Sequence, residues 1–167
     1  LLGRTFFLQG ELDAAVKELQ AGTVLAQNVG DRRAAAQGHL LLAQAHIGRH
    51  ELDLAGVYLS EAIDGTLATS DRLGTYQCLG IAAELAAARG VPESAAGLFA
   101  SEASLFRAAD AAIPPADLLR REPIIARMQA ELDEASLAQA EEVGTSRDWL
   151  SSVAAAKRVA GRIRRVK

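Results

Sequence analysis

Three segments of the chain repeat at a spacing of 40 residues. They begin at Gly10, His50 and Gly90, and their sequences are Gly-Glu-Leu-Asp-Ala-Ala-Val, His-Glu-Leu-Asp-Leu-Ala-Gly and Gly-Val-Pro-Glu-Ser-Ala-Ala. Each opens with a turn residue and has an acidic residue in the first helical turn that comes next, where it opposes the partial positive charge of the helix N-terminus. A fixed period of this length is typical of stacked supersecondary units. The repeat therefore predicts a solenoid, in which each unit buries its apolar face against its neighbours.

The alignment extends beyond these segments. Ala15, Ala55 and Ala95 occupy equivalent positions, and Gly30-Asp31 aligns with Ser70-Asp71. Both dipeptides are typical of helix starts, because an Asp side chain can accept from the free N–H groups of the first turn. Each unit is therefore predicted to be a helix, a tight turn and a second helix, with small residues where the two helices approach closely.

The composition favours helices throughout. Half of the residues are hydrophobic but only 4% are aromatic, so the apolar mass is alanine and leucine. These residues have high helix propensity, and strands are usually rich in β-branched and aromatic residues. We predict an all-α fold, an α-α superhelix of helical hairpins with a C-terminal helical cap. Three hairpins occupy 1–113, and the capping region of the same domain occupies 114–167.

The turn signals predict the helix bounds. We expect helices at about 1–9, 11–28, 31–48, 51–64, 71–89 and 92–111. Pro114-Pro115 ends the repeats, because proline cannot continue a helix. A further helical region is expected at about 116–142, broken or restarted at Pro123. Gly144-Thr145-Ser146 is expected to cap a last helix at about 146–164.

The spacing of small and larger residues resembles the tetratricopeptide repeat. In the second unit the matching positions are Leu42-Ala43, His46, His50, Ala55, Leu59 and Ala62. In the third unit they are Ala82-Ala83, Ala86, Gly90, Ala95 and Phe99. The usual period of that repeat is about 34 residues, so these helices are longer.

Longer helices of this sort resemble the repeat region of large bacterial ATP-binding regulators, the relatives of the maltose-regulon activator, an arrangement that many LuxR-type regulators carry. The likeness covers roughly residues 30–160: an alanine-rich helix with Leu98-Phe99, then Pro114-Pro115, then Ile124, Met128, Leu132 and Gly144. The resemblance implies a regulatory protein with an ATPase module upstream, and none of that module is present in this chain. The chain begins at Leu1, without Met and within a helical pattern, so we expect a fragment of something longer.

Catalytic and metal-binding motifs are incomplete. His39, His46 and His50 share one helical face, but no nearby Cys or acidic residue completes a metal motif, and His50 is expected to lie past the helix end. Cys78 lies in an apolar run, and a catalytic thiol needs a base partner. Glu141 and Glu142 are adjacent and diverge on a helix. Because phosphate-binding loops and nucleophile elbows are also missing, we expect no enzyme, cofactor or metal site.

The concave face of the stack is the best candidate for function. In such stacks the first helix of each hairpin lines the inner surface. The inner positions predicted from the repeat alignment are Arg4, Phe7, Leu8, Gln37, Leu40, Gln44, Ile47, Gln77 and Glu84. A polar surface with a few apolar anchors suits an extended peptide or partner segment. The alternative is a face that is merely solvated.

The end of the chain is basic. Six residues after Ser151 are cationic and none is acidic: Lys157, Arg158, Arg162, Arg164, Arg165 and Lys167. An apolar stripe at helical spacing, Val153, Ala156, Ala160 and Ile163, favours a capping helix that docks on the preceding hairpin. The alternatives are an arm that contacts an anionic partner, or the entry to a further domain.

The expected partners follow from these features. They are a protein or peptide segment on the concave face and other domains of a longer parent chain. A net charge of −3 makes nucleic acid an unexpected partner, and no apolar run is long enough for a membrane span. The single cysteine fits a reducing, cytoplasmic location. The predicted function is protein binding or ligand sensing in a bacterial regulator, for which control of transcription is one candidate role. The alternatives are a stand-alone adaptor and a small all-α enzyme or metal protein.

Overall fold

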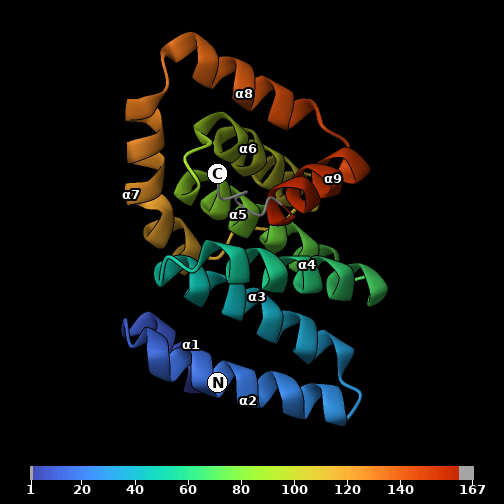
Figure 1. Cartoon of the computed structure of the whole chain (residues 1–167). Helices are drawn as coiled ribbons and strands as arrows, with labels where there is room; N and C mark the ends of the chain where they lie inside the picture. Colours follow the sequence, from blue (N-terminus) through green and yellow to red (C-terminus); the bar gives the residue numbers. More distant parts are fainter. Residues whose placement is uncertain (1, 162–167) are drawn as a thin grey trace.

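The computed structural model describes residues 2–161, which form nine helices and no strand (Figure 1). The helices are α1 (Leu2–Leu8), α2 (Leu12–Asn28), α3 (Arg32–Gly48), α4 (Leu52–Ala68), α5 (Arg72–Ala88), α6 (Pro92–Ala108), α7 (Pro115–Glu131), α8 (Glu134–Ser146) and α9 (Trp149–Ala160). Helices α1 to α6 form three antiparallel hairpins that stack in chain order. The predicted all-α superhelix of hairpins is confirmed.

The turns between the helices are copies of one structure. Five successive helices, α2 to α6, start 20 residues apart and are each 17 residues long. The residue two positions before each of these starts has a positive φ: Gly10, Gly30, His50, Ser70 and Gly90. The next N–H donates to a carbonyl five residues back, as Asp71 does to Thr66 at 2.9 Å, which is the Schellman pattern of helix ends. The 40-residue period is therefore two 20-residue half-units.

Alanines and glycines lie at the helix crossings. Ala15, Ala55 and Ala95, aligned by the repeat, are 0% exposed. Gly65 lies within α4, which continues to Ala68, so the helix end expected at about residue 64 is wrong. A Cβ at Gly65 would lie 2.7 Å from the Cβ of Ala36 in α3. This glycine allows close packing of two helices and is not a turn residue.

The third hairpin is surrounded by later helices. Helix α5 is buried on nearly all sides, with twelve buried residues among its 17. In Figure 1, α7 and α8 lie along two sides of α6, and α9 lies beside α4 and α5. The apolar residues Val153, Ala156 and Ala160 of α9 are buried, as the predicted stripe requires, whereas Ile163 lies outside the described residues. Docking is broader than predicted, because α9 contacts α4 of the second hairpin as well as the third hairpin.

Two other predicted breaks are wrong. Helix α7 passes through Pro123 without interruption and ends at Glu131. Pro123 is exposed, as is Leu119 one turn earlier, so the carbonyl that loses its donor faces water. Gly144 lies inside α8 and does not cap a helix. A Cβ there would overlap the backbone of Gly97 in α6, so the glycine allows the two helices to pack closely.

The last helix starts at Trp149 and not at 146. The side chain of Asp148 accepts from the N–H of Ser151 at 2.7 Å and provides the N-cap. None of the helices within residues 2–161 combines the length and the apolar character that crossing a membrane requires.

Candidate functional site

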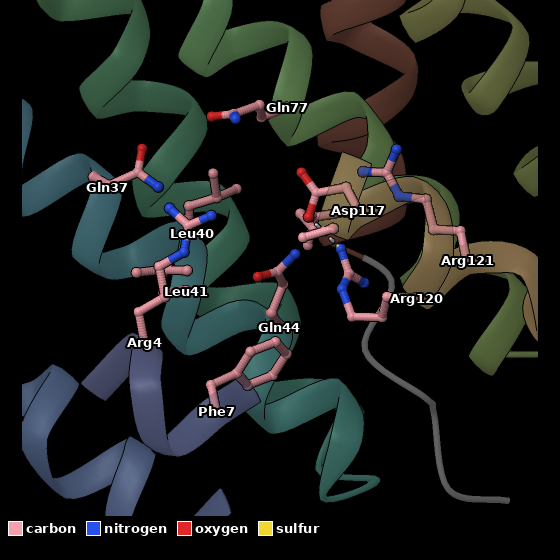
Figure 2. A pocket seen from close by; sticks show the side chains of 12 residues that line it. Arg4, Phe7, Gln37, Leu40, Leu41, Gln44, Gln77, Asp117, Arg120 and Arg121 are labelled. Atoms are coloured by element: carbon pink, nitrogen blue, oxygen red, sulfur yellow. Dashed lines mark hydrogen bonds and ion pairs between the residues drawn. The ribbon is translucent and has the colours of Figure 1, made fainter. Parts of the chain in front are cut away.

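A cleft lies where the inner helices of the three hairpins face α7 (Figure 2). Helix α3 supplies one wall, α1 and α5 the two ends, and α7 the opposite wall. The residues that line it are Arg4, Phe7, Gln37, Leu40, Leu41, Gln44, Gln77, Ile81, Ala116, Asp117, Arg120 and Arg121. The cavity has a volume of about 40 Å³, room for only a few water molecules. This is well below the volume of sites for drug-sized ligands, so a partner would contact the cleft from outside.

Six of the nine predicted concave-face residues line this cleft: Arg4, Phe7, Gln37, Leu40, Gln44 and Gln77. Three do not. Ile47 packs against the hydrophobic core, and Glu84 is buried in an ion-pair cluster. The side chain of Leu8 lies outside what the structure describes.

Three glutamine side chains define the chemistry of the cleft. Gln37 and Gln44 project from α3 and Gln77 from α5 (Figure 2). Gln37 and Gln77 are related by the 40-residue period, which places them at equivalent positions on successive inner helices. Within residues 2–161 none of these three amides has a hydrogen-bond partner. Each amide carries two donor hydrogens and one acceptor oxygen. Gln37 and Gln77 are half-buried and Gln44 is 8% exposed, so the first two are the more accessible to a visiting molecule.

Charged and apolar groups surround these amides. Arg4 of α1 is exposed and has no ion-pair partner among the described residues. Phe7 and Leu41 are half-buried, so each presents some apolar surface at the cleft. The arrangement combines one accessible cation, three amides and small apolar anchors.

The α7 wall carries charges that are already paired. Arg120 donates to Glu84 and, at 2.9 Å, to Asp117. Arg121 donates through Nε to Glu84 at 2.9 Å and through Nη1 to Glu102 at 2.7 Å. Glu84, Glu102 and Arg121 are at most 3% exposed. Helices α5, α6 and α7 therefore meet in a buried cluster of charges directly behind the cleft.

The environment of Glu102 is unusual for a carboxyl group. Burial raises its pKa to about 7, although the neighbouring Arg121 guanidinium acts in the opposite direction. Burial opposes the charge of Arg121, but Glu102 and Glu84 outweigh this effect and raise the guanidinium pKa. Among the described residues, Glu102 Oε1 and Arg121 Nη2 are buried polar atoms without a hydrogen-bond partner. The cluster is thus compact but incompletely satisfied.

Sequence reasoning missed half of the cleft. Leu41 and Ile81 are themselves 40 residues apart, so the repeat could have located them beside Gln37 and Gln77. Ala116, Asp117, Arg120 and Arg121 follow the last repeat. Their position depends on how α7 returns across the stack, and no local pattern specifies that return.

The histidines serve the packing of the second hairpin. His46 is buried, stacks on Tyr58 at a centroid distance of 5.1 Å and bonds to Glu51. That bond with His46 is the main cause of a lowered pKa for Glu51. His50 lies past the end of α3, as expected. Within residues 2–161 no three His, Cys, Asp or Glu side chains converge to hold a metal ion.

Cys78 and Lys157 are not among the residues that line the cleft. Cys78 is 0% exposed, and burial raises its pKa to about 12, so the thiol is protonated at neutral pH. Lys157 of the basic segment pairs with Asp64 at 2.6 Å. Arg162, Arg164, Arg165 and Lys167 lie outside the described residues.

Comparison of the chain with family models, with curated proteins and with solved structures finds no match.

Proposed function

We propose that this chain is a binding module, and that an extended segment of a partner protein binds along the opening of its concave cleft. The observation that carries the proposal is the set of unpaired amides of Gln37, Gln44 and Gln77 in one cleft. An extended peptide leaves its own N–H and C=O groups free, and glutamine side chains offer matching acceptors and donors.

The other features of the cleft support the same class of ligand. Its volume suits individual side chains and not a whole small molecule. Phe7 and Leu41, which are half-buried at the cleft, supply apolar contacts for alternate side chains of a peptide, and Arg4 offers a charge to an acidic one. Because Arg4 and the amides come from different hairpins, an extended ligand can contact several repeats at once.

The test begins with selection of binding peptides from a random display library, with the intact chain as target. Dissociation constants of the selected peptides are then measured for the wild type, Gln77→Arg and Gln27→Arg. Gln77 is half-buried in the cleft, whereas Gln27 is exposed on α2 and is not among the cleft residues. The two variants introduce the same chemical change at different faces.

We expect Gln77→Arg to weaken binding by about tenfold, equivalent to about 1.4 kcal/mol. Gln27→Arg should leave the dissociation constant within about twofold, because surface substitutions away from an interface have small effects. Equal effects of the two variants, or a selection that yields no binder, would contradict the proposal.

The wider setting, a sensing module of a bacterial regulator, is a proposal that rests on the family resemblance alone. Its test is the gene that encodes the chain. A phosphate-binding loop encoded upstream in the same reading frame would support a regulator. An open reading frame that encodes the repeats alone would favour a stand-alone adaptor.

A further inference from the structure

Helix α7 is attached to the stack through a buried cluster of charges and a small apolar contact. Only Arg121 and Met128 of its 17 residues are buried. Leu118 and Leu119 are 48% and 67% exposed, so the helix leaves much of its apolar surface in water. Its hydrophobic burial is limited to Met128, which lies in the core, and to the partly buried Ile125 that packs against the core. It is therefore smaller than in most helices, which bury a continuous apolar face.

The pocket that receives Arg121 matches a guanidinium group. Glu84 of α5 and Glu102 of α6 accept from two different nitrogens of the group, at 2.9 and 2.7 Å. The ring of Phe99 lies beside it, with 5.4 Å from the ring centroid to the guanidinium carbon. Two carboxylates and an aromatic face are the groups that bind a planar cation with several donors.

Gly80 of α5 makes the space for this cation. A Cβ at position 80 would overlap the guanidinium of Arg121 and would lie 2.6 Å from Oε2 of Glu102. Any other residue would thus close the pocket. Its shape comes from α5 and α6, and α7 contributes only the side chain that enters it.

The ion pairs of Arg121 contribute little net binding free energy between α7 and the stack. Removing a carboxylate and a guanidinium from water costs several kcal/mol for each ion, which offsets most of their attraction. The unpaired Glu102 Oε1 and Arg121 Nη2 add to the cost. A charge contact of this kind selects its partner strongly and binds it weakly.

We propose that α5 and α6 carry a receptor for an arginine side chain, built from Gly80, Glu84, Phe99 and Glu102. Arg121 of the same chain occupies the receptor, so α7 acts as a strap, a helix that lies across the stack and can be displaced from it. An arginine-bearing helix of a partner protein takes its place when the strap leaves.

Displacement of α7 also changes the cleft. One wall of the cleft consists of Ala116, Asp117, Arg120 and Arg121, all on this helix. Loss of the wall opens the face that carries the glutamine amides. This consequence rests on the proposed function, whereas the receptor itself does not.

The first experiment supplies α7 in trans. A labelled peptide of residues 115–131 is titrated into the intact wild-type chain and into the Arg121→Ala chain. We expect the variant to bind the peptide at least about tenfold more tightly, because its own tethered helix no longer competes at high effective concentration. A peptide that itself carries Arg121→Ala should bind neither chain. Equal binding of the two peptides would overturn the proposal.

A second measurement uses small cations. Ethylguanidinium should raise the melting temperature of the Arg121→Ala chain by about 3 °C at ten times its dissociation constant. Ethylammonium at the same concentration, which lacks the planar fork, should not. The rise should vanish in Gly80→Ala/Arg121→Ala, whose pocket is filled. If ethylguanidinium still raised the melting temperature of that double variant, the proposal that the cation binds in this pocket would be contradicted.

Hydrogen exchange of the wild-type chain covers the case in which Arg121→Ala does not fold. Amides of α7 should exchange through a local opening that leaves α5 protected. Simultaneous exchange of both helices would show that α7 is a fixed part of the core and would overturn the strap. These readouts use no selected peptide, so their failure is distinct from a failure of peptide binding at the glutamines.

Discussion

At the residue scale, the repeat turns depend on backbone conformations that suit glycine. Gly10, Gly30 and Gly90 have φ values of 80°, 77° and 71°, whereas His50 and Ser70 adopt 59° and 54°. The left-handed region costs a residue with a side chain about 1–2 kcal/mol. Two of these five turns therefore carry strain that the other three avoid.

Replacement of Ser70 by glycine should relieve this strain. Glycine also loses more backbone freedom on folding, by about 0.4–1 kcal/mol, so the expected net gain in unfolding free energy is about 0.5–1 kcal/mol. Urea unfolding of the Ser70→Gly chain measures it. The matched reverse change is Gly30→Ala, where a Cβ would meet nothing within 4 Å and only the backbone is strained. It should lose about 1 kcal/mol, and a gain in stability there would refute the argument.

At the element scale, α8 packs against α6 through two glycines. A Cβ at Gly144 would overlap the carbonyl of Gly97, so Gly144→Ala should push the helices apart and cost about 1–3 kcal/mol. Gly22 in α2 has open space around it, so Gly22→Ala should instead stabilise by up to about 1 kcal/mol through helix propensity. Thermal melts of both variants give the comparison. If both substitutions changed the melting temperature in the same direction, the close contact of α6 and α8 at Gly144 would be contradicted.

The charge cluster under α7 should make stability depend on pH. Burial raises the pKa of Glu102 from 4.5 to about 7, with Glu84 and Asp117 acting in the same direction and Arg121 against it. The folded form thus holds this proton more tightly. Its contribution to stability is present below about pH 4.5 and is lost as the pH rises through about 7.

Substitution of Glu102 by glutamine should remove that dependence. Urea midpoints at pH 5 and pH 8, which flank the value of about 7, should differ less for Glu102→Gln than for the wild type. Glu122 is exposed on the same helix as Arg121, and Glu122→Gln should keep the wild-type difference. If Glu102→Gln retained the full difference between the two pH values, another group would be responsible.

At the scale of the whole molecule, α9 joins the second and third hairpins. Val153 and Val159 are buried against them, Trp149 packs edge-on to Tyr76 at 5.4 Å, and Arg89 donates to the carbonyls of Val159 and Leu52. Removal of residues 149–167 should lower the melting temperature strongly, because each buried valine contributes about 1.5–3 kcal/mol.

A shorter truncation separates packing from charge. Removal of residues 162–167 takes away four of the six basic residues and keeps α9. If α9 acts through packing, the longer truncation should cause much the larger loss of stability. Equal melting temperatures for the intact chain and the longer truncation, together with lost salt-sensitive DNA binding, would favour an anion-binding arm instead.

The sequence was sufficient for the hairpins, because their turns and alanines recur locally at a fixed period. The helix ends predicted near Gly65 and Gly144 are wrong, because these glycines lie inside helices. They allow close packing against Ala36 and Gly97, which are distant in the chain. The α7 wall could not be predicted. In the sequence alone, Arg120-Arg121 has the pattern of an exposed charged pair. Only the fold shows that these arginines pair with Glu84 and Glu102.

The most direct test of the account is a hydrogen-exchange map of the intact chain with and without a selected peptide. Binding in the cleft should slow exchange around Gln37 and Gln44 in α3 and around Gln77 in α5, while α2, which contributes no residue to the cleft, stays unchanged. Protection confined to α2 and α4, or no protection on α3 and α5, would contradict a binding site on the concave face.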